Sequence, residues 1–287
     1  MRRDRLSRHA NLSNFLGRPV RVIVLAVVLL AVLFPFYWLV TNALKTSNEY
    51  FASPPVMFPT RMTVANFVQI VEQDDALQGL RNSFLISFFA TLLTAVSGSL
   101  AAYALINGIL PRRLKSVLAT WFLVQKMYPA VVIAVPVFFV MNRLHLLDSI
   151  WSLVIMNASF NLPLVILLMI GFYAEAPFEI EEQAMIDGCD LLGRYARVTT
   201  PMVKAGIVAV SILTFIGTWN EFLYAVFLTI LKAKPLTVII AGFITDKGIL
   251  WGPMAAMGCV VVIPVLVLMW IVQRDFVSGV SAGALKA

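Results

Sequence analysis

Six long stretches of apolar residues dominate the pattern of hydrophobic and polar positions along the chain. Each is long enough for a helix to cross a hydrocarbon core of about 30 Å, which takes about 20 residues. The stretches are Val22–Val40, Asn82–Ile106, Ser116–Met141, Ile150–Tyr173, Ala205–Leu231 and Met254–Gln273. This pattern predicts an all-α, polytopic membrane protein with six transmembrane helices over residues 22–273.

Two of the stretches contain an ionisable residue, and several contain proline. Lys126 lies in the third stretch and Glu221 in the fifth. Ionisable groups are costly in lipid, and an interior proline leaves a backbone carbonyl without its donor. The prolines of this kind are Pro129, Pro136, Pro163 and Pro264. These helices are therefore expected to pack in a bundle, where neighbouring helices satisfy the freed groups.

The composition supports a membrane location and disfavours other classes. Of the 287 residues, 60% are hydrophobic and only 13% are charged, whereas soluble domains have about 25% charged residues. The net charge of +7 would suit nucleic acid, but the basic residues lie mostly at span ends, and the basic N-terminal segment 1–21 suits anionic lipid headgroups. No nucleic-acid partner is expected. The two cysteines and two histidines are scattered, so no metal site is expected.

The distribution of basic residues predicts the orientation of the chain. The apolar run after Arg21 is too long for a signal peptide and lacks a small-residue cleavage site, so it is expected to remain as the first span. With the N-terminus in the cytoplasm, fourteen of the 22 Lys and Arg residues are cytoplasmic, seven lie outside and Lys126 lies within the membrane. The positive-inside rule therefore predicts that the N-terminus and the C-terminal tail, residues 274–287, are both cytoplasmic.

The largest predicted cytoplasmic loop, residues 175–204 between spans four and five, is patterned for short helices. Pro177 suits a helix start, and the three glutamates that follow favour the positive end of the helix dipole. Gly188 is expected to end this helix, Asp190 to cap a second one, and Pro201 to mark the start of span five. The second helix is expected to form an amphipathic surface for a partner groove. That surface would contain Leu191, Leu192, Tyr195 and Val198, with Arg194 and Arg197 beside them.

Three runs of sequence carry a family resemblance. The run Glu182-Gln183-Ala184-Met185-Ile186-Asp187-Gly188-Cys189, with Tyr195 and Val198-Thr199-Thr200-Pro201 after it, resembles the coupling motif of ATP-binding-cassette (ABC) importer permeases. It departs from that motif at Gln183 and Thr200, where Ala and Leu are usual. The runs Gly217-Thr218-Trp219-Asn220-Glu221-Phe222 and Gln273–Gly279 are similar to carbohydrate importer permeases of the maltose and glycerol-phosphate type. The resemblance covers nearly the whole chain after about Val22.

The resemblance implies a bacterial inner-membrane subunit that works by alternating access. Its implied partners are a second permease in a heterodimer, two ABC ATPase subunits, an extracytoplasmic sugar-binding protein and the sugar. A role in ATPase coupling is implied for Glu182, Ala184, Asp187, Gly188, Tyr195 and Pro201. The chain has no Gly-x-x-x-x-Gly-Lys-Ser/Thr phosphate loop, so it is expected to be no enzyme and to bind no cofactor itself. ATP and Mg would be bound by the ATPase partner.

Five residues are candidates for the translocation pathway, because aromatic faces and polar groups deep in spans can bind sugars. They are Lys126, Tyr128, Trp219, Asn220 and Glu221. Trp219 and Asn220 suit helix packing equally well, and the different depths of Lys126 and Glu221 leave open whether these two residues interact. Likewise, the helix that ends at Gly188 could equally be an ordinary acidic surface helix, and Tyr195 could be an aromatic residue at the membrane interface.

Two other classes of function are weighed against the permease. A secondary carrier would explain the intramembrane charges, but the chain shows no internal repeat. Uptake that survives proton and sodium uncouplers would reject it. An integral membrane enzyme is disfavoured, because the sequence has no metal cluster and no nucleophile with a matching base.

Overall fold

The computed structural model describes residues 18–72, 75–107 and 110–284. Predictions for residues 1–17 and 285–287 lie outside this part of the chain. The longer helices are α2 (Arg18–Ala43), α4 (Ala76–Ile106), α5 (Arg112–Met127), α6 (Ala130–Arg143), α7 (Ile150–Ala174), α11 (Lys204–Trp219) and α14 (Trp251–Ala284). The shorter ones are η1 (Ser47–Glu49), α3 (Ala65–Glu72), α8 (Phe178–Ile186), α9 (Leu191–Gly193), η2 (Arg194–Thr199), α10 (Thr200–Met202), α12 (Leu223–Leu228) and α13 (Leu236–Ala241).

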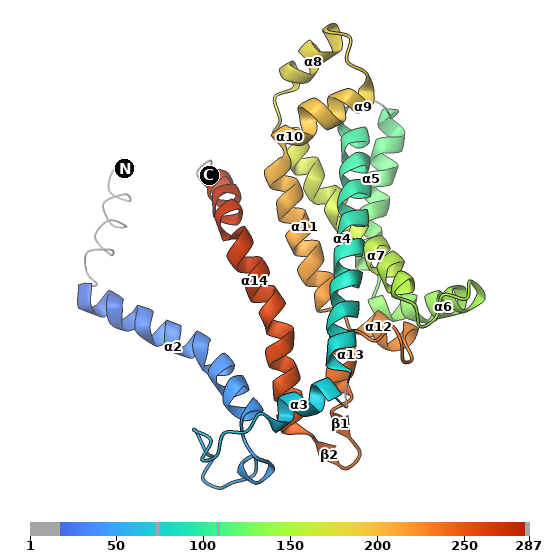
Figure 1. Ribbon diagram of the computed structural model, residues 1–287. Helices are drawn as coiled ribbons and strands as arrows, with labels where there is room; N and C mark the ends of the chain where they lie inside the picture. Colours follow the sequence, from blue (N-terminus) through green and yellow to red (C-terminus); the bar gives the residue numbers. More distant parts are fainter. Residues whose placement is uncertain (1–17, 73–74, 108–109, 285–287) are drawn as a thin grey trace.

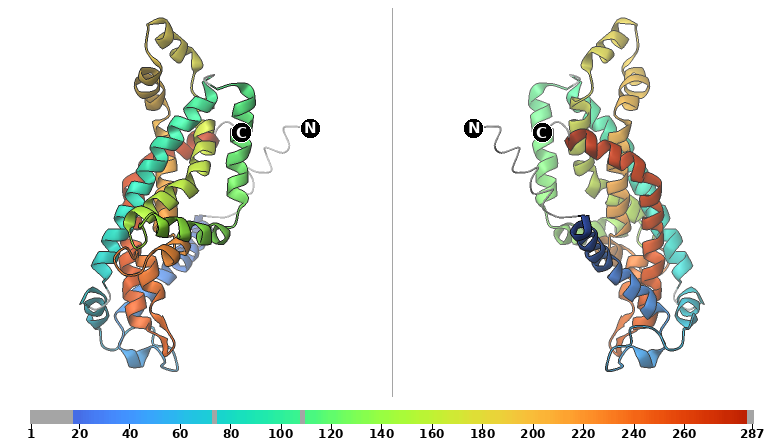
Figure 2. Two further views of the ribbon diagram at one scale, coloured as in Figure 1. Left: turned by 90° about the vertical axis from the view of Figure 1, so that its right-hand side faces the viewer. Right: turned by 90° about the vertical axis from the view of Figure 1, so that its left-hand side faces the viewer.

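The helices form a bundle with distinct structures at its two ends (Figures 1 and 2). Helix α4 lies along both α7 and α11 in the centre. The connection from α7 to α11, which contains α8 and α9, extends from one end. At the other end lie α3 and an antiparallel hairpin of β1 (Ile244–Thr245) and β2 (Gly248–Ile249). Helix α2 slants away from the bundle and meets α14 near the hairpin end.

Four helices are long and apolar enough to cross a membrane, and the number rises to six if each of two bent helix pairs counts as one span. The four cover Val20–Ala43, Ala76–Ile106, Ile150–Ala174 and Trp251–Gln273. The bent pairs are Arg112–Met127 with Ala130–Arg143, at 99°, and Leu191–Met202 with Lys204–Trp219, at 80°. Four predicted spans thus correspond to single continuous helices, and the other two are interrupted.

The predicted third span, Ser116–Met141, is not one continuous helix. The chain turns sharply between α5 and α6, where Tyr128 has φ −73° and ψ 130° and Pro129 has φ −61° and ψ 132°. A proline ring disfavours helical geometry in the residue before it and supplies no N–H. The sequence Tyr128-Pro129 therefore ends α5 and sends α6 off at a steep angle.

The predicted fifth span, Ala205–Leu231, is also interrupted. Helix α11 ends at Trp219, and a separate helix, α12, begins at Leu223. The Glu221 carboxylate accepts hydrogen bonds from the backbone N–H groups of Tyr224 (2.6 Å) and Ala225 (3.2 Å). A carboxylate in this position satisfies the otherwise unpaired N–H groups of a helix start, so Glu221 favours a new helix over continuation of α11.

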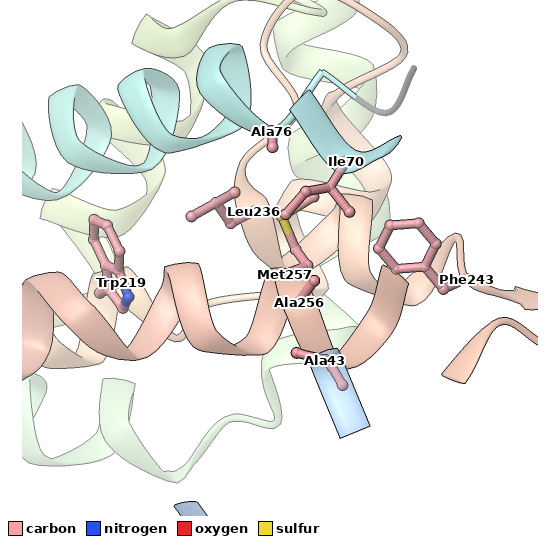
Figure 3. Packing of buried hydrophobic residues seen from close by; sticks show 9 residues of the cluster. Ala43, Ile70, Ala76, Trp219, Leu236, Phe243, Ala256 and Met257 are labelled. Carbon is pink, nitrogen blue, oxygen red and sulfur yellow. The ribbon is translucent and has the colours of Figure 1, made fainter. Parts of the chain in front are cut away.

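A buried apolar cluster packs several helices together at the hairpin end of the bundle (Figure 3). It brings together residues from α2, α3, α4, α11, α13 and α14, and its members include Ala43, Ile70, Ala76, Trp219, Leu236, Phe243, Ala256 and Met257. Small side chains such as Ala43 and Ala256, both 0% exposed, let helices approach closely, as is typical of helix contacts in membranes.

Candidate functional site

The α7–α11 connection is built around a tight turn between two short helices. Helix α8 follows Pro177 and ends at Ile186, and Gly188 has φ +80°, a conformation that glycine adopts without strain. The Asp190 carboxylate then accepts a hydrogen bond of 3.1 Å from the backbone N–H of Gly193 and caps α9. The expected stop at Gly188 and cap at Asp190 are confirmed.

Most residues of the predicted coupling set lie on the outside of this connection. Glu182 on α8, Asp187 and Gly188 in the turn after it and Pro201 on α10 are exposed, whereas Ala184 on α8 is half-buried. Exposed Leu192 (67%) and Ile186 (85%) lie among them. The connection thus presents an apolar and acidic surface that the described part of the chain leaves exposed.

A buried glutamate that sequence reasoning did not single out ties this connection to the bundle. Glu181 is 5% exposed. Its carboxylate accepts hydrogen bonds from Tyr103 Oη (2.5 Å), Asn107 Nδ2 (2.8 and 2.9 Å) and Thr199 Oγ1 (3.2 Å). The Arg194 guanidinium lies 3.8 Å away. Helix α8 is therefore joined through one carboxylate to the end of α4 and to η2.

Glu181 could have been found from one signal in the sequence. Glu181 and Ala184 are three residues apart, and residues at this spacing share one face of a helix. In the structure these two positions are the inward ones of α8. A small residue one turn after a glutamate indicates a helix face that packs closely against another element. Glu181 lies on that face with Ala184, and Glu182 does not.

Tyr195 does not lie on the outer surface with Leu191 and Leu192, as the sequence led us to expect. Its ring lies 5.1 Å from that of Tyr103, and its hydroxyl is 2.9 Å from Ser99 Oγ, which also contacts the Tyr173 hydroxyl at 2.7 Å. The reason is that residues 194–199 form a turn of π-helix, η2, which changes the side-chain register. Tyr195 therefore faces the bundle.

Lys126 and Tyr128 lie at the break between α5 and α6. Lys126 is in the last turn of α5, with Nζ 4.3 Å from the centre of the Phe160 ring on α7, a cation–π contact. Tyr128 is 56% exposed. Both residues thus lie close to the point where the chain turns from α5 into α6.

The Trp219-Asn220-Glu221 run is divided between three environments. Trp219 is 2% exposed, stacks on Phe215 and donates from Nε1 to the Val261 carbonyl (3.3 Å), which favours the packing interpretation. Asn220 is exposed and its amide donates to the Ile216 carbonyl of its own chain (2.9 Å). Glu221 is occupied as the cap of α12.

The structure does not join Lys126 to Glu221. Within residues 20–273 outside the two short gaps, the single ion pair links Arg194 to Glu181. Instead, Asn161 of α7 lies near the break between α11 and α12. Its amide donates to Thr218 Oγ1 (3.4 Å), and its Oδ1 faces Gly217. Among the described residues, no cluster of three His, Cys, Asp or Glu side chains could hold a metal ion.

The fold resembles that of solved membrane transporters. A structure described as a bacterial ABC transporter involved in the import of the acidic polysaccharide alginate matches with a TM-score of 0.76 at 21% identity, over 91% of this chain and 97% of the other. This likeness shows that the two chains share a fold.

Sequence comparison identifies the family. Residues 95–274 match the family described as "Binding-protein-dependent transport system inner membrane component", and the chain belongs to it. The sulfoquinovosyl glycerol transport system permease protein SmoH of Agrobacterium fabrum is 33% identical over 96% of both chains. The trehalose transport system permease protein SugB of Mycobacterium tuberculosis is 31% identical over 88% of this chain and 92% of the relative.

Proposed function

We propose that this chain is one permease subunit of a carbohydrate ABC importer, which forms half of the translocation pathway and couples ATP hydrolysis on a separate ATPase subunit to alternating access. The observation that carries the coupling role is the Glu181 network. It joins α8 to the end of the central helix α4 through hydrogen bonds of 2.5–2.9 Å and to η2 through one of 3.2 Å.

A rigid connection of this kind suits the transmission of movement. Displacement of a flexible loop is absorbed locally, whereas displacement of α8 is passed to α4 through Tyr103 and Asn107 and to η2 through Thr199. Elements joined by packed side chains and buried hydrogen bonds move together. An ATPase that binds the surface of Glu182, Asp187 and Gly188 would therefore move the bundle.

The proposed arrangement has both termini and the α7–α11 connection in the cytoplasm and the hairpin end outside. The partners are a second permease, two ATPases that bind ATP and Mg, and an extracytoplasmic binding protein. A carbohydrate substrate is supported by the relatives, whose names specify sulfoquinovosyl glycerol and trehalose. Lys126, Tyr128, Asn161 and Asn220, at the two helix breaks, are the side chains we assign to the pathway.

Asn220→Ala is expected to lower uptake several-fold while leaving assembly and melting temperature close to wild type. The amide is exposed and bonds only within its own helix turn, so its loss removes no contact between helices among the described residues. Uptake per assembled complex and the melting temperature decide the case. Normal uptake with lowered stability would assign Asn220 to helix packing.

The proposed function is tested with the complete complex in proteoliposomes. Uptake of a radiolabelled sugar identified by mass spectrometry of the copurifying ligand is expected to need internal ATP and external binding protein. It is also expected to persist when proton and sodium gradients are dissipated. Gradient-driven uptake without ATP would establish a secondary carrier instead.

A further inference from the structure

We infer that a pocket between the end of α2, the loop after it and the start of α14 binds the phosphate group of a membrane phospholipid. The pocket has a volume of about 170 Å³. It lies where α2 meets α14, at the hairpin end of the bundle (Figure 1). Its lining includes Trp38, Asn42, Lys45, Glu49, Tyr50 and Trp251. The inference goes beyond the proposed function and does not depend on it, because it holds whichever side of the membrane this end faces.

Lys45 places a buried positive charge in the lining of this pocket. The residue is 2% exposed. Its Nζ donates to Asn42 Oδ1 (2.9 Å) and lies 4.2 Å from the centre of the Trp38 ring, but among the described residues it forms no ion pair. Burial lowers the pKa of Lys45, and the Glu49 carboxylate raises that pKa by less. A buried charge is costly unless it is paired, so Lys45 lacks a counter-ion within the described chain.

The nearby carboxylate of Glu49 is committed to the loop instead. It accepts hydrogen bonds from the backbone N–H and hydroxyl of Thr46 (3.0 Å each) and from those of Thr60 (2.7 and 2.6 Å). These bonds, above all the one from the Thr60 hydroxyl, lower the pKa of Glu49 to about 2. Both carboxylate oxygens are therefore occupied at neutral pH, and the positive charge of Lys45 remains open to a ligand.

The walls of the pocket are held in place from three segments. The Tyr50 hydroxyl donates to the Lys45 carbonyl (2.9 Å), and the Asn66 amide donates to the same carbonyl (3.1 Å) and to Tyr50 Oη (3.2 Å). A side chain at Gly252 would collide with Tyr50 and Asn66, so glycine allows the start of α14 to approach this closely. Trp251 is thus fixed beside the pocket. A preformed site of this kind lowers the entropy cost of binding.

The surroundings of the pocket indicate contact with lipid. Lys45 lies two residues beyond the end of α2, which is long and apolar enough to cross a membrane. Trp38 and Trp251 have the amphipathic rings that are typical of headgroup depth. The loop after α2 also exposes Phe51 (78%) and Phe58 (72%), and such side chains next to a membrane span are expected to contact lipid. An anion that reaches Lys45 at this depth is therefore expected to be a lipid phosphate.

The size of the pocket and the charge of its lysine agree with this ligand. Lysine binds phosphate as a point charge with rotatable N–H donors. A volume of about 170 Å³ is below the roughly 300–1,000 Å³ of sites for drug-sized ligands, so the pocket suits a phosphate and the adjoining glycerol. Helix α2 is exposed from residue 20 to residue 36, which leaves apolar surface for the acyl chains.

The test measures lipid binding to the protein purified in detergent with its copurifying subunits and stripped of lipid. Phosphatidylglycerol is titrated and counted by native mass spectrometry. In Lys45→Met, which removes the charge but keeps a long side chain, we expect the dissociation constant of the tightest-bound lipid to rise about tenfold. The matched control is Lys247→Met, at an exposed lysine of the hairpin at the same end. The control is expected to bind the lipid like wild type.

Two other ligands distinguish a lipid headgroup from a free anion. Diacylglycerol, which lacks the phosphate, is expected to bind wild type no better than Lys45→Met. Inorganic phosphate in large excess is expected to leave the bound phosphatidylglycerol in place, because the acyl chains add apolar contacts that the free ion lacks. Displacement by inorganic phosphate would assign the pocket to a soluble anion and overturn the inference. Equal affinity of wild type and Lys45→Met for phosphatidylglycerol would overturn it as well.

Two further measurements guard against a variant that fails to fold. Lys45→Arg keeps the positive charge and is expected to retain most of the affinity for phosphatidylglycerol. A phosphatidylglycerol with a photoreactive group in its headgroup is expected to label the native protein within residues 38–56 or at Trp251. Labelling that omits both segments would overturn the inference even if Lys45→Met were unstable.

Discussion

Replacement of Glu181 by alanine is expected to lower the free energy of unfolding by about 3 kcal/mol or more and to release the ATPase from the complex. The substitution leaves the donors of Tyr103, Asn107 and Thr199 without their acceptor and leaves Arg194 without its counter-charge. Thermal melting of the purified chain and copurification of the ATPase measure the two effects.

The neighbouring Glu182 provides a matched control for this prediction. Glu182→Ala removes the same carboxylate from an exposed position on the same helix, so a stability change within about 0.5 kcal/mol is expected. Glu181→Gln keeps the shape and one acceptor oxygen, and it is expected to lie between wild type and Glu181→Ala. If Glu181→Ala melts like Glu182→Ala, the network does not hold the connection.

Gly188→Trp is expected to leave the chain folded and inserted but to reduce ATP-driven uptake by more than tenfold. A non-glycine residue at φ +80° costs about 1–2 kcal/mol, which a well-packed bundle tolerates. A Cβ atom at this position would have no atom of the described residues within 4 Å, apart from residue 188 and the two residues beside it. The bulk of the tryptophan would therefore project outward, where we place the ATPase.

Gly188→Asn separates strain in the turn from steric obstruction outside it. Asparagine adopts left-handed geometry more readily than other non-glycine residues and is small. It is expected to retain most of the uptake and most of the stimulation of ATPase activity by the binding protein. Wild-type uptake by the tryptophan variant would show that this turn does not approach the ATPase.

The parts of the fold that depend on local chemistry could be predicted from the sequence. The stop at Gly188 and the cap at Asp190 follow from the preferences of single residues, and four of the predicted spans match continuous helices. The Tyr128-Pro129 step shows the limit of this reasoning. The sequence places Pro129 within the third span, but the 99° angle depends on what α6 packs against.

The parts that depend on distant contacts could not be predicted. Glu181 receives donors from residues 74 to 78 positions earlier in the chain, and no local pattern reports such a pairing. Tyr195 was assigned outward by helical periodicity, which a turn of π-helix alters. Trp219 and Asn220 are adjacent in sequence but differ in burial. Trp219, the last residue of α11, is buried, and Asn220, the residue after it, is exposed.

The two interrupted helices have a consequence for the solvation of the backbone. Their second halves, α6 and α12, pack against each other in one apolar cluster. The last turn of α5 leaves carbonyl groups without donors from its own helix, and lipid offers none. At the end of α11, the backbone N–H groups of Asn220 and Glu221 donate to the carbonyls of Ile216 and Thr218. Met127, Tyr128 and Asn220 at these ends are exposed. The end of α5 is therefore expected to border water or another protein rather than hydrocarbon. The hydration of the peptide backbone, independently of any side chain, thus indicates the surface of this subunit that borders an aqueous cavity or its partner.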